Sequence, residues 1–304
     1  MRHFTVYFFL SLLLLISIIG ITGCSGIQGT DKNDISTVVT ADNEWKIDHA
    51  VIVVHNLTAS MDKFSAAGFN VVLGGEHADS VTHNALIPFK DGSYLEIFAP
   101  TNPAMAAGMH ELVTSGTFDT AMTGSDAIQK RFMLHLAEGT GLKDFAISYP
   151  GLNISKEKIV AEHGGFVLDG PIPMSRTRPD GIIVRWHVAV PAFQYSTSIP
   201  FLIVDDTPRT LRVPDGNLTS HPNGVTGIRS IEIATRDPVA VTRWYDAVLS
   251  TKPESASDTQ ATYMLNGSVI IVRETAKNET EGPVGIVLDK DTGDVFTLEN
   301  FTIE

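Results

Sequence analysis

The sequence predicts an α+β fold built from repeated βαβββ units whose strands form mixed sheets. Two observations predict this fold. Apolar runs of strand length alternate with single helical segments, always in the order strand, helix, strand, strand, strand. This order occurs three times along the chain, and such internal repetition is typical of an architecture built from one repeated unit.

The first unit covers residues 44–100. The apolar, largely β-branched run from Ile47 to Val54 predicts a buried strand. A helical segment with a three- and four-residue apolar spacing follows, and Gly68 ends it as a helix C-cap. We expect the remaining three strands over residues 70–73, 84–89 and 94–98.

The second unit covers residues 141–206 and repeats the pattern, with a helix over residues 155–162. Its strands are expected over residues 144–148, 166–168, 172–177, 181–190 and 198–204. An insert of one or two short helices, residues 101–140, separates it from the first unit. A third unit, residues 224–304, has a strand over 228–233, a helix over 238–249, and two strands hinged at Asn266-Gly267, which is a strong hairpin signal.

Two polar residues lie where the strand pattern requires apolar ones. Because strand side chains alternate, His49 should share a face with Ile47 and Val51, and Glu96 with Tyr94. A carboxylate inside a buried strand is costly unless it is paired, hydrogen-bonded or bound to a metal. The two residues therefore predict either two ligands of a divalent-ion site or a His–Glu pair in the core.

Several short motifs resemble one known family. They are Asp48-His49, Gly68-Phe69, His77, the run from Thr82 to Pro88, Tyr94-Leu95-Glu96, the run from Arg176 to Gly181, Arg185-Trp186 and Pro200-Phe201. Together these motifs resemble the glyoxalase-like domain family of the vicinal oxygen chelate superfamily. The resemblance covers roughly residues 44–206 and names no substrate.

The resemblance implies that two βαβββ units pair into an open bowl of strands, the vicinal oxygen chelate fold. It also implies one divalent metal ion (Fe, Mn or Zn), when a metal is present, held from the first and last strands. His49 and Glu96 match those positions, whereas the second unit offers Asp144 and Leu202, and the third Ser230 and Ile271. His83, His187 or water would complete the shell, and the ion would stabilise an enolate or oxyanion.

Other polar residues are candidates for the same cavity. We expect catalytic roles for Glu96 and His83, and substrate binding by Thr82, Asn84, Arg176, Arg178, His187 and His221. Guanidinium groups suit anionic substrates, although the two arginines could equally be exposed hairpin charges. His77 is interpreted as a solvated loop residue, Trp186 as core packing, and His110 and His135 as surface or packing residues.

Residues 1–24 predict a targeting segment. A short basic start precedes an almost unbroken apolar run, and Ile21-Thr22-Gly23-Cys24 resembles a lipoprotein cleavage motif. We therefore expect lipidation at Cys24, residues 25–43 as a flexible tether, and a protein anchored to the outer face of the membrane or within the envelope. An uncleaved membrane anchor is the alternative. The lone cysteine excludes an internal disulfide.

The net charge of −13 argues against a nucleic-acid partner, which requires basic patches. Three functions remain open. The first is an envelope-tethered, metal-dependent enzyme of the lyase, isomerase or dioxygenase type that acts on a small oxygen-rich or anionic molecule. The second is a metal-free protein that sequesters a small ligand, and the third is an inactive structural module of the envelope. The sequence does not predict an oligomeric state.

Overall fold

The computed structural model describes residues 44–78, 80–192 and 198–298. By its contacts the chain divides into Met1–Thr40 and Ala41–Glu304, and the described residues all belong to the second unit. The predicted signal peptide, Cys24 and the tether lie outside the described residues. Among the residues that are described, no helix is both long enough and apolar enough to cross a membrane.

The first two repeats have the predicted order of elements. The first consists of β1 (Lys46–Val53), α1 (Leu57–Ala66), β2 (Val72–His77), β3 (Thr82–Pro88) and β4 (Tyr94–Pro100); the second of β5 (Gly141–Ser148), α5 (Ile154–His163), β6 (Leu168–Thr177), β7 (Ile183–Pro191) and β8 (Phe201–Asp205). Two boundaries differ from the prediction. β2 continues to His77, and β6 is one strand with an irregularity between Asp169 and Ile172, where two strands were expected.

The strands of these two repeats form a closed barrel in the order β1-β4-β3-β2-β6-β7-β8-β5. The prediction of an open bowl was therefore wrong. The reason lies in the greater length of β2, because its last residues, Glu76 and His77, pair with Thr177 and Arg176 of β6. On the other side β1 pairs antiparallel with β5, so the two repeats meet along two seams.

The insert between the repeats forms three helices, α2 (Ala104–Thr114), α3 (Phe118–Ala121) and α4 (Ala127–Ala137). The Asp126 side chain accepts a hydrogen bond from the Gln129 backbone N–H, and the Gln129 side chain accepts one from the Asp126 backbone, so a capping box fixes the start of α4. Buried apolar residues of α4, including Ile128 and Met133, join the apolar cluster of β1, β7 and β8. The insert thus packs onto the inner face of the barrel strands.

The third repeat forms a separate sheet. A joining segment with α6 (Arg209–Arg212) and η2 (Gly216–Thr219) leads to β9 (Val225–Thr235), α7 (Pro238–Val248), β10 (Ser255–Ala256), β11 (Gln260–Met264), β12 (Val269–Glu274), β13 (Gly282–Lys290) and β14 (Val295–Thr297). The strand order is β10-β11-β12-β9-β13-β14. β12 pairs with β9 in parallel, as β4 pairs with β1. β13, which was not predicted, pairs antiparallel with β9, as β5 pairs with β1.

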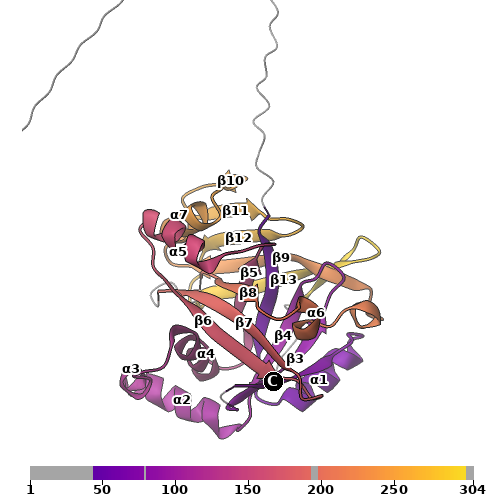
Figure 1. Ribbon diagram of the computed structural model, residues 1–304. Helices are drawn as coiled ribbons and strands as arrows, with labels where there is room; N and C mark the ends of the chain where they lie inside the picture. The colour runs from indigo at the N-terminus through magenta and orange to yellow at the C-terminus, as the bar shows by residue number, and fades with distance from the viewer. Residues whose placement is uncertain (1–43, 79, 193–197, 299–304) are drawn as a thin grey trace, which may run out of the picture. The chain divides into compact units, whose positions relative to one another are not determined.

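One large apolar cluster joins the third repeat to the outer side of the barrel. Trp244 and Tyr245 of α7 are buried in it together with Phe145 of β5. The helices α5 and α7 contact each other at the same junction, where Figure 1 shows them side by side. Burying two large aromatic rings there stabilises the junction by several kcal/mol at about 25 cal/mol per Å². The third repeat therefore supports the barrel wall from outside.

Candidate active site

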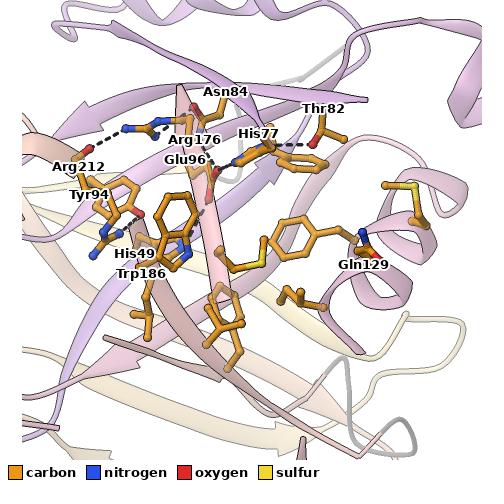
Figure 2. Close-up of a pocket in the computed structure, with 18 residues that line it drawn as sticks. His49, His77, Thr82, Asn84, Tyr94, Glu96, Gln129, Arg176, Trp186 and Arg212 are labelled. Carbon is orange, nitrogen blue, oxygen red and sulfur yellow. Dashed lines mark hydrogen bonds and ion pairs between the residues drawn. The ribbon is translucent and has the colours of Figure 1, made fainter. Parts of the chain in front are cut away.

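A pocket lies inside the barrel. Side chains from β1 to β4, α4, β6 to β8 and α6 line it, and Figure 2 shows them. It contains about 650 Å³ of unfilled space, counted with its opening to solvent. Its polar lining residues are His49, His77, Thr82, Asn84, Tyr94, Glu96, Gln129, Arg176, Trp186 and Arg212; the apolar ones are Phe98, Ile128, Phe132, Met133, Met174, Val188, Phe201 and Ile203.

A bulge in β1 places Asp48 directly behind His49, which lines the pocket. In the pairing with β5 the register shifts between Ile47 and His49, so Asp48 is the extra residue. Ile47 therefore packs in the outer apolar cluster while Val51 packs in the inner one, and the prediction that Ile47 shares the face of His49 was wrong. The bulge also lets Asp48 Oδ1 come within 2.8 Å of His49 Nδ1.

Glu96 is the centre of the polar end of the pocket. Its Oε2 lies 3.4 Å from His49 Nε2, and its Oε1 accepts a hydrogen bond of 2.6 Å from Asn84 Nδ2. His77 Nε2 lies 3.7 Å from the same Oε1, and Nδ1 of His77 contacts Thr82 Oγ1 at 3.0 Å. The predicted face of β4 is confirmed, because Tyr94 and Glu96 both line the pocket.

Two arginines of the joining segment support the Asp48–His49 pair from behind. Arg209 Nη1 donates to Asp48 Oδ2 at 2.6 Å, and Arg212 Nη2 lies 3.4 Å from the same oxygen. Arg212 also donates to Tyr94 Oη at 2.6 Å and forms an ion pair with Asp205. The Tyr94 ring in turn stacks on the His49 imidazole, with 4.5 Å between the ring centroids. The plane of the His49 ring is therefore fixed by Tyr94, and its Nδ1 is fixed by Asp48.

These contacts shift the ionisation of the buried groups. Burial by itself raises the pKa of Glu96, but the bond to His49, the charges of His49 and His77, and the bond from Asn84 outweigh it and lower this pKa to about 2. For Asp48 the Arg212 and Arg209 charges outweigh burial, so its pKa lies well below the usual range. Burial lowers the pKa of His49, but its bonds to Asp48 and Glu96 raise it more. The geometry thus favours an imidazolium between two carboxylates.

Arg176 of β6 completes the polar end of the pocket. Its Nη1 donates to Asn84 Oδ1 at 3.2 Å and its Nη2 to the Arg212 carbonyl at 2.9 Å. Asn84 therefore lies between Arg176 and Glu96, with its amide orientation fixed from both sides, as Figure 2 shows. A Cβ on Gly74 would lie 2.0 Å from Asn84 Oδ1, so this neighbour must be glycine for the three side chains to meet.

Four of the predicted site residues lie elsewhere. His83 lies between Thr82 and Asn84 on β3, so its side chain projects from the opposite face of the strand. His187 alternates in the same way with Trp186, and its Nδ1 contacts Asp206 Oδ1 at 2.8 Å. Two further candidates occupy other places: Arg178 donates to Asp180 and to the Leu211 carbonyl, and His221 accepts from the Asn70 backbone N–H while its Nε2 lies 2.9 Å from the Pro88 carbonyl.

Other pocket residues were missed or misread from sequence. His77 was interpreted as a solvated loop residue, but the longer β2 places it in the pocket wall, where its side chain is 10% exposed. Trp186 is buried, as expected, and also lines the pocket. The contribution of α4 and the role of Arg212 had no local sequence signal. For Asp48 the sequence does contain a local signal, the Asp48-His49 dipeptide, although this dipeptide alone predicts no role for the carboxylate.

The donor set of this pocket does not fit a divalent-ion centre. Within the described ranges, no group of three or more His, Cys, Asp or Glu side chains is placed to hold a metal ion. One Glu96 oxygen already accepts from Asn84, and the guanidinium groups of Arg176 and Arg212 bring positive charge to the same end. These side chains suit an anion better than a cation. The predicted metal ion stays a prediction from the family resemblance.

Comparison with known proteins agrees with this fold. The model of a family described as "Glyoxalase-like domain" matches residues 47–249. A hypothetical protein from Staphylococcus aureus has a similar structure, with a TM-score of 0.59, 15% identity, and coverage of 83% of this chain and 98% of its own. No curated protein sequence matches the chain.

Two methylmalonyl-CoA epimerase structures are more distant. The one from Mycobacterium tuberculosis has a TM-score of 0.33 and 13% identity, and the match covers 54% of this chain and 89% of the epimerase. The one from Streptomyces coelicolor, a single-residue variant in complex with 2-nitronate-propionyl-CoA, has a TM-score of 0.33 and 18% identity, with coverage of 53% and 98%.

Proposed function

This chain belongs to the glyoxalase-like domain family, and from that premise and the geometry of its pocket we propose that it is a small-molecule enzyme of the isomerase or lyase type. The observation that carries the proposal is the buried contact between Glu96 and His49, which lies at the polar end of the pocket and joins a potential base to a potential acid. A purely structural ion pair would not need a cavity beside it. The substrate is a small molecule with a carbonyl oxygen, and the reaction is a proton transfer.

The ligand-free site holds Glu96 as a weak base, because His49 and Asn84 stabilise its carboxylate. The His49 contact is loose for a hydrogen bond at 3.4 Å. A substrate carbonyl oxygen that accepts the Nε2–H of His49 would remove the His49 hydrogen bond from Glu96. Burial would then raise the pKa of Glu96 and make it a stronger base in the complex.

The proposed step is balanced within the complex. A C–H bond next to the carbonyl breaks, its proton moves to Oε2 of Glu96, and its electron pair moves into the carbonyl group. The enolate oxygen that forms accepts the hydrogen bond from His49, whose positive charge Asp48 balances at Nδ1. Return of the proton to carbon regenerates Glu96, so the step consumes no other reactant.

The test is a screen in D₂O. The full chain is incubated with a panel of small oxo and hydroxy acids, aldehydes and esters, and ¹H NMR follows the loss of signals from carbon-bound protons next to a carbonyl. We expect at least one compound to exchange its proton for deuterium faster than in buffer. If a compound binds but no compound in the panel exchanges a proton, the result would instead support the alternative, a metal-free sequestration protein.

Metal dependence, predicted from the resemblance, has its own measurement. The purified chain is analysed for bound metal after incubation with Fe(II), Mn(II) or Zn(II), beside the Glu96→Gln variant. From the donor set we expect no stoichiometric metal in either protein. Near-stoichiometric metal that disappears in the variant would support the metal-dependent form of the reaction instead.

We also propose that the protein is exported and anchored by a lipid at Cys24. Residues 1–24 of the sequence support this, together with the polar composition of residues 25–43 that follow. Mass spectrometry of the mature protein tests it: the expected N-terminus is a lipidated Cys24, and the Cys24→Ser variant should lose the lipid. An intact Met1 in the mature protein would contradict the proposal.

A further inference from the structure

Among the described residues at the polar end of the pocket, one guanidinium has no carboxylate in direct contact. Asp48 pairs with Arg209 and Arg212, Asp205 pairs with the same two arginines, and Glu96 faces His49. Arg176 differs from them all, since it donates hydrogen bonds to two neutral carbonyl oxygens, those of the Asn84 side chain and the Arg212 backbone.

Arg176 is also deeply buried. The residue is 3% exposed, and among the described residues its Nε has no hydrogen-bond partner. A buried guanidinium with no carboxylate in hydrogen-bond contact is costly, because water no longer solvates it and the charge of Glu96 acts on it only from the far side of Asn84. An anionic group of a ligand in the pocket would supply the missing charge. One carboxylate suffices to pair with one guanidinium, so the expected ligand carries one negative charge.

An aromatic wall adjoins the two histidines of the pocket, since Phe201 contacts His49 and Phe98 contacts His77. Phe132 lies at its centre, with its ring centroid 4.7 Å from that of Phe98 and 6.1 Å from that of Phe201. Aromatic walls favour aromatic guests, which they contact through ring edges and faces. Figure 2 shows Gln129 of α4 on the side of the pocket away from Arg176 and Arg212.

Asn84 sets the spacing between the anion and the base. Its amide lies between Arg176 and Glu96, so an anion held at Arg176 would be separated from the Glu96 carboxylate by the width of one amide group. This separation reduces the repulsion between the two negative charges and leaves the carbon next to the anionic group close to Glu96.

We infer that the ligand of this pocket is a monoanionic carboxylic acid with an aromatic body, whose carboxylate is balanced by Arg176 and whose ring lies against the aromatic wall. This inference rests on the proposed function in one respect, namely that the pocket is the active site. It names the substrate class, which the proposed proton transfer leaves open.

The test is isothermal titration of the full chain with three probes of known chemistry: 3-phenylpropionate, its neutral isostere 3-phenylpropionamide, and acetate. We expect 3-phenylpropionate to bind at least tenfold more tightly than either of the others. Arg176→Gln should remove this preference. Arg178→Gln is the matched control, because Arg178 lies on the continuation of the same strand, is partly exposed and pairs with Asp180, so the preference should be unchanged.

The outcomes separate the two proposals. Equal binding of the acid and the amide to the unchanged protein, or an Arg176→Gln variant that keeps the preference, overturns the inference. If Arg176→Gln does not fold, Arg176→Lys and the probe preference of the unchanged protein decide the question. If the protein prefers 3-phenylpropionate but exchanges no proton, the inference holds and the proposed catalysis fails. If the protein exchanges protons of neutral substrates and shows no preference for anions, the proposed catalysis holds and the inference fails.

Discussion

His49 Nε2 lies 3.4 Å from Glu96 Oε2, so the first and last strands of the first repeat meet at a buried ionic contact. The contact continues through His49 Nδ1 to Asp48, and from Asp48 to Arg209 and Arg212. Each member balances the charge of its neighbours. The predictions below follow from that coupling and from the packing around it.

Removal of His49 should destabilise the fold. His49→Ala leaves Asp48 and Glu96 buried with less positive charge between them, and breaking a buried pair in this way costs about 3 kcal/mol. Urea unfolding measures the loss. His187→Ala is the control, because His187 pairs with the partly exposed Asp206, and this change should cost less than about 1 kcal/mol. Equal losses in the two variants would contradict the coupling.

Stability should fall in acid because of Glu96. Its pKa is lowered from 4.5 to about 2 in the folded protein, so its stabilising contribution is present above pH 4.5 and is lost as the pH falls toward 2. Urea midpoints of the unchanged protein and of Glu96→Gln, measured from pH 6 to pH 3, should therefore converge as the pH falls. A constant difference between them over this range would show that Glu96 is not held ionised by its neighbours.

The structure explains which of these features the sequence could predict. The βαβββ order was predictable because apolar periodicity determines which face of a strand or helix is buried, and His49 and Glu96 were predictable because they interrupt that periodicity. The bulge at Asp48 was not predictable, because an extra residue in one strand does not change the amino-acid composition of that strand. His77 was missed because it follows Gly74-Gly75, which imitates a loop. Arg212 lies 164 positions from Asp48 in the sequence, and no local pattern connects them.

A second buried cluster should hold α4 against the barrel. Asp144 of β5 accepts two hydrogen bonds of 2.6 Å from Arg131 and lies 2.8 Å from His135, both on α4. Asp144→Asn should cost about 3 kcal/mol, because Arg131 would stay buried without a full counter-charge. Limited proteolysis should then cut within the insert, residues 101–140. Glu138→Gln, which removes an exposed partner of His135, is the control, and comparable cutting in it would contradict this role.

Substitution of Gly74 should damage the pocket without removing a polar group. In Gly74→Ala the new Cβ would lie 2.0 Å from Asn84 Oδ1 and 3.0 Å from Arg176 Nη1. We expect at least a tenfold weaker binding of 3-phenylpropionate by titration calorimetry. Gly108→Ala, in α2 with no atom within 4 Å of the new Cβ, should leave binding unchanged and stabilise the helix by up to about 1 kcal/mol. Unchanged binding in Gly74→Ala would show that Asn84 and Arg176 do not form the site.

The most direct test of the proposed function compares deuterium exchange and binding in Glu96→Gln with those in the unchanged protein, on the same compound from the D₂O screen. Glutamine keeps the shape of the side chain but cannot take the proton. The account predicts that binding changes by no more than about threefold while exchange falls by at least about a thousandfold, within the range that general bases contribute. Exchange that continues in Glu96→Gln at the original rate would contradict the role of Glu96 as the base.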